Sequence, residues 1–244
     1  LGTSSRSTDQ RLALAEQILK AKRSPVLFDH LIDVVDALIT AAVIARSVGS
    51  FEGALRYVEG AAEFLSLSSM LSSYDRKLAE LRCAVLLDIK GASIEDAELE
   101  SLLLGAQTPL DTARAVRLQA AVLILRGQFE DAMNASLAGL RCLDIKLSRT
   151  PSADEIESAY RTTMAALGSV SLEHLSEQPR ASDEATIAAM DLLATLQSSF
   201  FSDDGLKFVH TAKIVELSIV HGVAGATCYG LSWFGVCLTS YYGE

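Results

Sequence analysis

The sequence predicts an all-α fold, a superhelix of antiparallel helix hairpins. Three observations support this prediction. Half of the 244 residues are hydrophobic, 21% are charged and only 4 are prolines, a composition that favours packed helices over disorder. Apolar residues recur at helical spacing, and the alternation typical of strands is absent. A turn sequence of glycine, acids and alanine also recurs, as GSFEGA from residue 49 and RGQFEDA from residue 126.

The first half of the chain divides into one leading helix and three helix pairs. The leading helix is expected over residues 9–22, with an apolar side, and Ser24-Pro25 ends it. The three pairs are expected at 27–48 with 51–67, 74–90 with 94–104, and 111–126 with 129–143. Because the connections are short, consecutive helices should lie antiparallel.

The recurring turn has a physical explanation in each pair. Gly49 and Gly127 should adopt the left-handed conformation that ends a first helix. The acids that follow favour the positive end of the second helix, and Ala54 and Ala132 let the two helices approach closely. In the middle copy, GASIEDA, the alanine Ala97 comes one residue later.

Small residues also recur at fixed distances from this turn. Ala42 and Ala120 lie seven residues before the turn glycine, and Ala61 and Gly139 lie seven residues after the turn alanine. The pattern resembles tetratricopeptide repeats, whose period is about 34 residues, although the early tryptophan and closing proline of that family are missing. A generic helical bundle and an open repeat superhelix both fit these spacings, and the repeated turn favours the superhelix.

The pattern becomes irregular after residue 147. Ser152 and Glu155 have capping-box spacing and start a helix. Further helices are expected at 171–176, from Asp183 to Phe200, from the turn at 202–205 to His221, and at 225–240. The ending YYGE resembles the start of another glycine turn. The expected organisation is therefore an N-terminal helix leading in from a preceding domain (1–26), three hairpin repeats (27–147), and irregular helical repeats cut inside a repeat (148–244).

Charge and cysteine usage exclude several classes of protein. A net charge of −10 and a pI near 4.9 argue against a nucleic-acid partner, which requires a basic face. None of the four cysteines belongs to a CxxC pair, and all four are expected to be small buried hydrophobes in a reducing compartment. They are Cys83, Cys142, Cys228 and Cys237.

One long segment lacks charge altogether. Residues 217–243 contain no Asp, Glu, Lys or Arg, a length that could span a membrane. Its glycines, hydroxyl residues and His221 favour buried repeat helices instead, with HGVAG as a break between them. The opening LGTSSRSTDQ lacks the apolar core of a signal peptide, so a cytoplasmic location is expected.

The order of segments resembles one family of large signalling proteins. GQFEDAMNASLAGLRCLDIKL, a capped helix, SLEHLSEQP and the stretch from SDEATIAAM to SWFG are similar to its helical repeat region. In these bacterial and fungal proteins a serine/threonine-kinase-like domain and a P-loop ATPase precede the repeats, and a sensory domain and a histidine kinase follow. The resemblance covers the whole chain and is most specific between Gly127 and Gly235. It implies a non-catalytic scaffold. Val223, after Gly222, departs from the polar residue expected there.

Few residues are candidates for chemistry. His30 and Asp33 lie one turn apart and could share a metal ion, but a solvated helix face is the simpler interpretation, since Asp29 and Asp36 point elsewhere. The pair Glu173-His174 is interpreted in the same way. A surface charge stripe is predicted for three residues at helical spacing, namely His210, Lys213 and Glu216.

Two further clusters could meet partners. The acidic run Glu95, Asp96, Glu98 and Glu100 is expected to be a solvated repeat face, with a basic partner as the alternative. The aromatic group is expected either to pack against the preceding helix or to form an exposed patch that drives self-association. It comprises Tyr229, Trp233, Phe234, Tyr241 and Tyr242. The second alternative predicts a homodimer through the C-terminal helices.

Together these observations predict a non-catalytic scaffold that binds protein partners or neighbouring domains of the same chain. No catalytic, metal-binding or cofactor-binding residue is expected. The first alternative is a regulatory module that senses a small metabolite in the superhelix groove. The second is an enzyme with helix-borne His and Asp residues, which would need His30 close to His174, His210 or His221.

Overall fold

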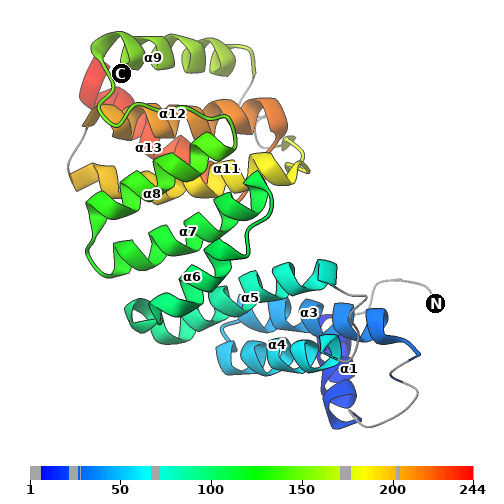
Figure 1. The fold of residues 1–244 in the computed structure, drawn as a ribbon. Helices are drawn as coiled ribbons and strands as arrows, with labels where there is room; N and C mark the ends of the chain where they lie inside the picture. Colours follow the sequence, from blue (N-terminus) through cyan, green and yellow to red (C-terminus); the bar gives the residue numbers. More distant parts are fainter. Residues whose placement is uncertain are drawn as a thin grey trace. The chain divides into compact units, whose positions relative to one another are not determined.

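A computed structural model of the chain describes residues 7–21, 27, 29–66, 72–170, 177–201 and 204–243. Within these ranges the chain forms eleven α-helices and two 3-10 helices, joined by short turns (Figure 1). The only β-type pairing among the described residues is an isolated bridge between Arg180 and Val223. The predicted all-α class, with consecutive helices packed as hairpins, is confirmed.

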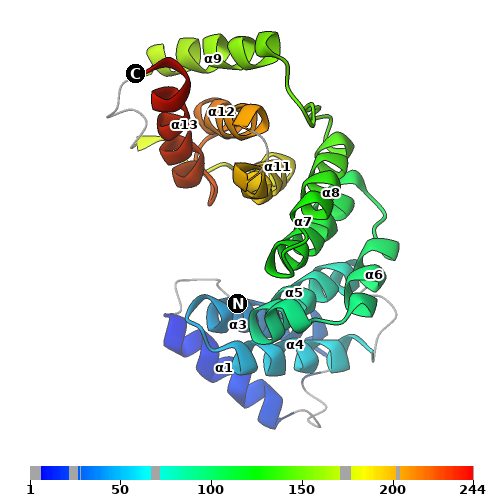
Figure 2. The same ribbon diagram turned by 90° about the vertical axis from the view of Figure 1, so that its left-hand side faces the viewer.

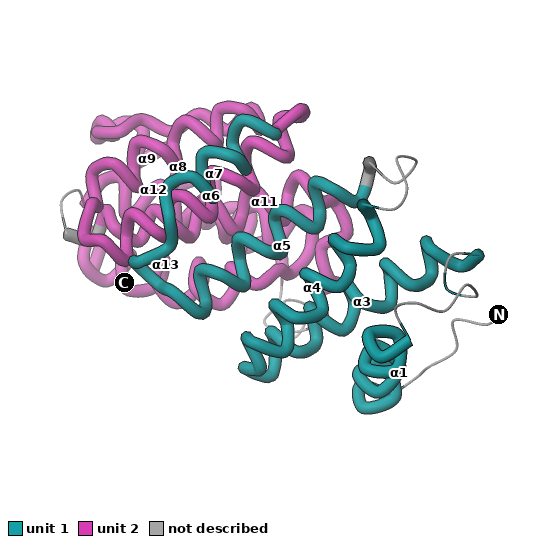
Figure 3. The backbone as a smooth tube through the Cα atoms, turned by 60° about the horizontal axis from the view of Figure 1, so that its bottom comes forward, with its two compact units in different colours: residues 1–105 teal, residues 106–244 magenta. Residues whose placement is uncertain are grey.

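The chain consists of two compact units, residues 1–105 and 106–244 (Figure 3). Unit 1 contains six helical segments: α1 (Thr8–Lys20), α3 (Leu31–Ser47), α4 (Phe51–Leu65), α5 (Ser72–Lys90), the 3-10 helix η2 (Gly91–Ser93) and α6 (Asp96–Leu104). Each α-helix begins and ends within four residues of the predicted bounds where those bounds are described. The exact end predicted at Leu67 lies outside the described residues, and α4 ends at Leu65.

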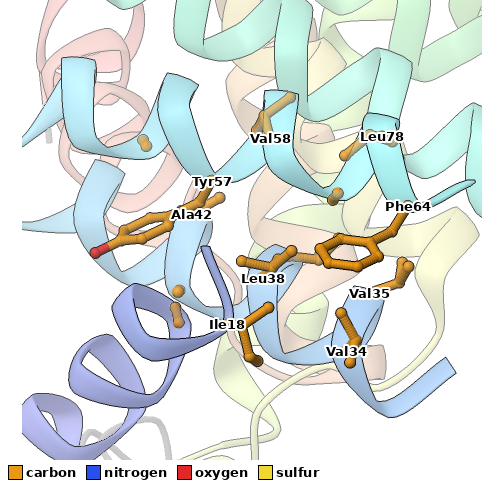
Figure 4. Close-up of a cluster of buried hydrophobic side chains, with 14 of the residues drawn as sticks. Ile18, Val34, Val35, Leu38, Ala42, Tyr57, Val58, Phe64 and Leu78 are labelled. Carbon is orange, nitrogen blue, oxygen red and sulfur yellow. The ribbon is translucent and has the colours of Figure 1, made fainter. Parts of the chain in front are cut away.

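The core of unit 1 lies between α1, α3, α4 and α5 (Figure 4). Leu38 and Val58 are fully buried there, and Phe64 is 2% exposed. Burying an aliphatic or aromatic side chain of this size stabilises the fold by about 1.5–3 kcal/mol. The Tyr57 hydroxyl at the edge of this core donates a hydrogen bond of 2.7 Å to the Glu16 carboxylate, which ties α4 to α1.

The recurring glycine turn has the predicted left-handed geometry, with φ of +78° at Gly49 and +74° at Gly127. The amide after each glycine donates to the third-last residue of the first helix, since Ser50 N–H and Gln128 N–H bond Ala45 O and Leu123 O, each at 2.8 Å. This is the Schellman arrangement, which satisfies carbonyl groups at a helix end. The predicted small positions Ala42, Ala54, Ala61, Ala120 and Ala132 are all fully buried.

The middle copy of the turn differs from the other two. Gly91 is also left-handed, with φ +55°, but it is the first residue of η2, and α6 begins only at Asp96. Ala97 is therefore exposed in the first turn of α6, and Ile94 takes the buried position at 1% exposure. The predicted equivalence of Ala97 with the other turn alanines is wrong, because the extra 3-10 turn changes the helix phase.

The first helices of the two hairpins in unit 1 lie parallel. Near their N-terminal ends, the Tyr74 hydroxyl of α5 donates a 3.1 Å hydrogen bond to the Asp36 carboxylate of α3. Near their C-terminal ends, the Arg46 guanidinium of α3 forms an ion pair with Asp88 of α5. Since start meets start and end meets end, α3 and α5 have the relation expected for equivalent helices of successive repeats.

Unit 2 contains α7 (Pro109–Leu125), α8 (Phe129–Cys142), α9 (Ala153–Gly168), α11 (Glu184–Ala194), the 3-10 helix η3 (Thr195–Phe201), α12 (Asp204–His221) and α13 (Thr227–Tyr242). The predicted capping box of Ser152 and Glu155 begins α9. The helix predicted to reach Phe200 changes to 3-10 geometry after Ala194. The Thr195 hydroxyl donates a 2.6 Å bond to the Leu192 carbonyl there, and such back-bonding competes with regular helix. The helix predicted at 171–176 lies outside the described residues.

In unit 2, the main partner of α9 is a helix distant from it in sequence. Helix α9 lies against α12 (Figure 2), and its half-buried apolar side chains join the cluster around Phe208 and Phe234. Two polar contacts fix it, because Thr163 bonds Glu216 of α12 at 3.1 Å and Glu157 accepts from Tyr242 of α13 at 3.1 Å. The α12–α13 hairpin is thus covered by a helix that precedes α11 in sequence.

The turn between α12 and α13 is fixed by backbone pairing. Gly222 has φ +99°, and a Cβ there would lie 3.0 Å from the amide nitrogen of Ala181. Val223 pairs with the segment before α11, donating to Pro179 O and accepting from Ala181 N–H, each at 2.9 Å. The break predicted at HGVAG is confirmed, and the backbone of Val223 is used in this pairing.

The left-handed conformation of Gly127 leads to a prediction about stability. Gly127→Ala should lower the free energy of unfolding by about 1–2 kcal/mol, because an L-residue is strained at positive φ. Gly168→Ala is the matched control in the same unit, since a Cβ there would meet no heavy atom within 4 Å and its φ is not positive. Urea unfolding followed by circular dichroism measures both. Equal losses for the two variants would contradict the assignment.

Candidate functional site

The strongest sequence candidate for a metal site lies on the surface of unit 1. His30 precedes α3, and its Nδ1 is 3.8 Å from the Asp33 carboxylate, with the side chains 58% and 81% exposed. Asp36 bonds Tyr74 instead, one turn further along α3. Among the described residues no group of three or more His, Cys, Asp or Glu side chains is arranged to hold a metal ion. Glu173 and His174 lie outside these residues.

The predicted surface stripe of His210, Lys213 and Glu216 is wrong at its first member. His210 is fully buried between α12 and α13. Its Nδ1 is 2.8 Å from the Leu206 carbonyl, and its Nε2 is 3.0 Å from the Tyr229 hydroxyl. Because a carbonyl only accepts, Nδ1 carries the proton, and Nε2 accepts from Tyr229. One feature of the sequence indicates this burial, because the helix that faces His210 contains no charged residue.

Burial keeps His210 neutral. It lowers the pKa of His210 from 6.5 to about 4, and the hydrogen bond to the Leu206 carbonyl opposes this only in part. Burial likewise raises the pKa of Tyr229 above its usual value. The pair is a satisfied polar contact within a core, with both ring nitrogens of the histidine engaged. Such a histidine is poorly suited to acid–base catalysis at neutral pH.

The two other members of the stripe form a partly buried ion pair. Lys213 Nζ lies 2.9 Å from the Glu216 carboxylate, whose second oxygen accepts from Thr163 of α9. The Glu216 carboxylate therefore links α12 to α9, and Lys213 pairs with it from the same helix.

A second charged group lies between α7 and α11. Arg114 of α7 forms an ion pair of 3.0 Å with Glu184, the first residue of α11. Asp191, two turns along α11, is half-buried, and burial raises its pKa although Arg117 and Arg114 lower it. The desolvation of Asp191 therefore outweighs the two guanidinium groups near it.

The acidic run of α6 is partly paired within unit 1. Glu98 forms an ion pair with Arg82 of α5, and Glu95 lies 3.6 Å from Lys90. Asp96 and Glu100 are exposed. Half of the run thus fixes α6 to α5, and the other half faces solvent, as expected for a repeat face.

The aromatic group of α13 divides between core and surface. Phe234 is 2% exposed and lies 5.4 Å from Phe208 of α12 between ring centroids, whereas Tyr242 stacks on Tyr160 of α9 at 4.1 Å. Trp233 and Tyr241 are each 38% exposed. The interpretation as core is therefore confirmed for Phe234, whereas Trp233 and Tyr241 lie partly at the surface, and self-association stays a prediction.

The four cysteines are free thiols. Cys83 and Cys237 are buried, as predicted, but Cys142 and Cys228 are exposed. Cys142 lies in the last turn of α8 and Cys228 in the first turn of α13, where helix periodicity no longer determines which side is covered.

No family model matches the chain, and neither a curated protein nor a solved structure shows significant similarity to it. In the part of the chain that the structure describes, no helix is long and apolar enough to cross a membrane. The uncharged segment 217–243 is interrupted by the turn at Gly222.

His210 makes stability depend on pH. The unfolded histidine binds a proton near pH 6.5 and the folded one only near pH 4, so the unfolded state takes up more protons between these values. Stability is complete above about pH 6.5 and falls on acidification, by about 2 kcal/mol between pH 7.5 and pH 5. His210→Gln should remove this part of the pH dependence. The control is His221→Gln, an exposed position on the same helix, and urea unfolding at several pH values compares them. An unchanged slope in His210→Gln would contradict the neutral assignment.

Proposed function

We propose that the chain is a non-catalytic, tetratricopeptide-like scaffold that mediates protein interactions inside a large signalling protein. The observation that supports this most is the parallel placement of α3 and α5, tied at both ends by Tyr74–Asp36 and Arg46–Asp88. Equivalent helices placed side by side present their outer faces as one continuous surface, which repeat proteins use to bind other chains.

The outer face of α3 has the character of such a surface. Asp33 and Val43 are exposed along it, and Thr40 lies half-buried between them. Neighbouring domains of the same protein, or separate protein partners, would dock on this kind of mixed polar and apolar face. The association with an ATPase and a histidine kinase in the cytoplasm comes from the resemblance of the repeat region alone.

The surroundings of His210 and His30 support a non-catalytic role. His210 is bonded at both nitrogens inside the core, and His30 is largely exposed beside a single carboxylate. Neither is placed beside a nucleophile and an orienting group, which acid–base or nucleophilic catalysis requires.

Asp191 favours a second candidate, a module that senses a small metabolite. Its carboxylate is half-buried, and the guanidinium groups near it do not fully offset the desolvation. Both signs of charge lie nearby, from Arg114, Arg117 and Glu184. A ligand with an ammonium and a carboxylate group, such as a free amino acid, would complement this mixture of charges.

A thermal-shift panel separates the two candidates. The panel contains ATP, ADP, Mg²⁺, Zn²⁺, amino acids and small carboxylic acids. A ligand at about 100 times its dissociation constant stabilises a fold by about 2.7 kcal/mol, which is readily measured. We expect no saturable shift. A saturable shift with an amino acid that Asp191→Asn abolishes, and that Asp131→Asn at an exposed position of α8 preserves, would replace the scaffold proposal with the sensor.

A further inference from the structure

Helix α9 is the least buried of the α-helices described in unit 2. Of its sixteen residues only Thr163 is buried, whereas α8 has six buried residues among fourteen and α12 has eight among eighteen. Its apolar side chains pack on the cluster around Phe208 but are themselves only half-buried. Because hydrophobic stabilisation grows with the apolar area removed from water, α9 is held less firmly than the helices beneath it.

Three specific contacts fasten α9 to α12 and α13. The ring of Tyr160 stacks on Tyr242 of α13, with 4.1 Å between the centroids. The Tyr242 hydroxyl donates to Glu157, and the Thr163 hydroxyl donates to Glu216 of α12, each at 3.1 Å. These contacts fix one orientation of α9, since they involve both helices of the hairpin.

The α12–α13 hairpin has contacts of its own that do not involve α9. The two helices are joined by His210 with Tyr229 at 3.0 Å and by Ser218 with Thr227 at 2.9 Å. Helix α11 also packs on α12. The hairpin therefore keeps these contacts when α9 leaves it.

The chain before α9 supplies a fixed point and a pivot. Arg149 donates to both carboxylate oxygens of Glu130 on α8, at 3.0 and 2.8 Å. Ser152 then caps α9 through a capping box with Glu155, so this helix has its own start signal. Residues 150–152, between the fixed point and the helix, are where α9 can turn away.

The apolar pattern of α9 is that of a helix bound to the surface of another protein. Its half-buried residues Ile156, Tyr160, Met164 and Leu167 follow one another at four, eight and eleven positions from the first. Amphipathic helices that dock on apolar surfaces use this spacing for their anchor residues. The structure thus displays, in α9 itself, the kind of occupant that α12 and α13 accept (Figure 2).

We propose that α9 is a detachable strap over a helix-binding surface. We define the strap surface as the part of α12 and α13 that α9 covers, which includes Phe208, Ala212 and Val215 with Tyr242. When α9 swings away at residues 150–152, an amphipathic helix of a protein partner with the same apolar spacing takes its place. The partner rests on the proposed scaffold function, whereas the opening of α9 does not depend on it.

Hydrogen exchange of the full chain, followed by mass spectrometry, tests the opening. A single helix of this length is marginal in water, so α9 should lose its helical hydrogen bonds once it leaves the strap surface. The protection factors of α9 amides should be at least about 100-fold lower than those of α12 amides, because local opening requires less free energy than global unfolding. Equal protection of the two helices would overturn the proposal.

Two variants separate the strap from the hairpin beneath it. Thr163→Val keeps the side-chain shape but removes the bond to Glu216, and Tyr160→Ala removes the stacking on Tyr242. Each should lower the protection of α9 by at least about 5-fold and change that of α12 by less than about 2-fold. Thr162→Ala is the matched control, since this exposed position should leave the protection of α9 no lower. An equal loss in α12 would show that both helices open together and would overturn the proposal.

A peptide added to the full chain tests the occupant. The probe is a fluorescein-labelled peptide of residues 152–168, measured by anisotropy. The Tyr160→Ala chain should bind it at least about 10-fold more tightly than the wild-type chain, because its own α9 covers the strap surface for less of the time. The matched control peptide carries Tyr160→Ala and Leu167→Ala and should bind at least about 10-fold more weakly. Equal binding by the two chains, or no saturable binding, would overturn the helix-binding surface.

The strap and the scaffold function fail in different measurements. Rapid exchange in α9 together with a saturable small-molecule shift in the thermal panel would remove the scaffold and support the strap. Equal protection of α9 and α12 without any such shift would remove the strap and leave the scaffold function standing.

Discussion

The hairpins depend on the left-handed backbone at the residue that follows each first helix. At Gly49 and Gly127 this conformation brings the next amide onto the carbonyl of the third-last residue of the helix, at 2.8 Å in each case. Three residues connect the two helices in each case, and the second helix therefore starts in a fixed phase. Because the phase is fixed, Ala54 and Ala132 arrive at the hairpin contact fully buried. Where η2 intervenes, from Gly91 to Ser93, the phase changes and the same sequence pattern leaves Ala97 exposed to solvent.

The second half of the fold departs from this repeat through polar contacts within its core. The α12–α13 hairpin encloses the neutral His210. The hairpin is covered by α9, which is not its neighbour in sequence. The hydroxyl pair of Ser218 and Thr227, 2.9 Å apart, lies near the turn, and Val223 is paired with Pro179 and Ala181. Buried polar groups of this kind require partners in defined positions, so they fix one packing arrangement for α12 and α13.

Local sequence signals predict most of the helices, but they do not predict which side of each helix is buried against which partner. Capping residues, glycine turns and apolar spacing predict the helices because they act within a few residues, as at Ser152 and Gly127. The burial of His210 could not be derived in the same way. A spacing of three residues fits a stripe of side chains exposed to solvent as well as a stripe buried under another helix. Tertiary packing, which places the neutral Tyr229 opposite His210, determines that His210 is buried. The position of α9 has the same origin, since an amphipathic helix specifies which side is buried but not against which partner.

The absence of charge in α13 has a physical cause on its buried side. On the inner side a charge next to Phe234 or the neutral His210 would lose its hydration, so the core excludes it. That reason does not extend to Val236, which faces outward. The helix α3 is buried as thoroughly on one side and yet carries Asp33 and Asp36 on the other. A helix that only needed to cover its core would therefore tolerate acids on its outer side. The exposed positions Ser232, Val236 and Thr239 of α13 carry no acid, so burial against the core explains the composition of the inner side of this helix only.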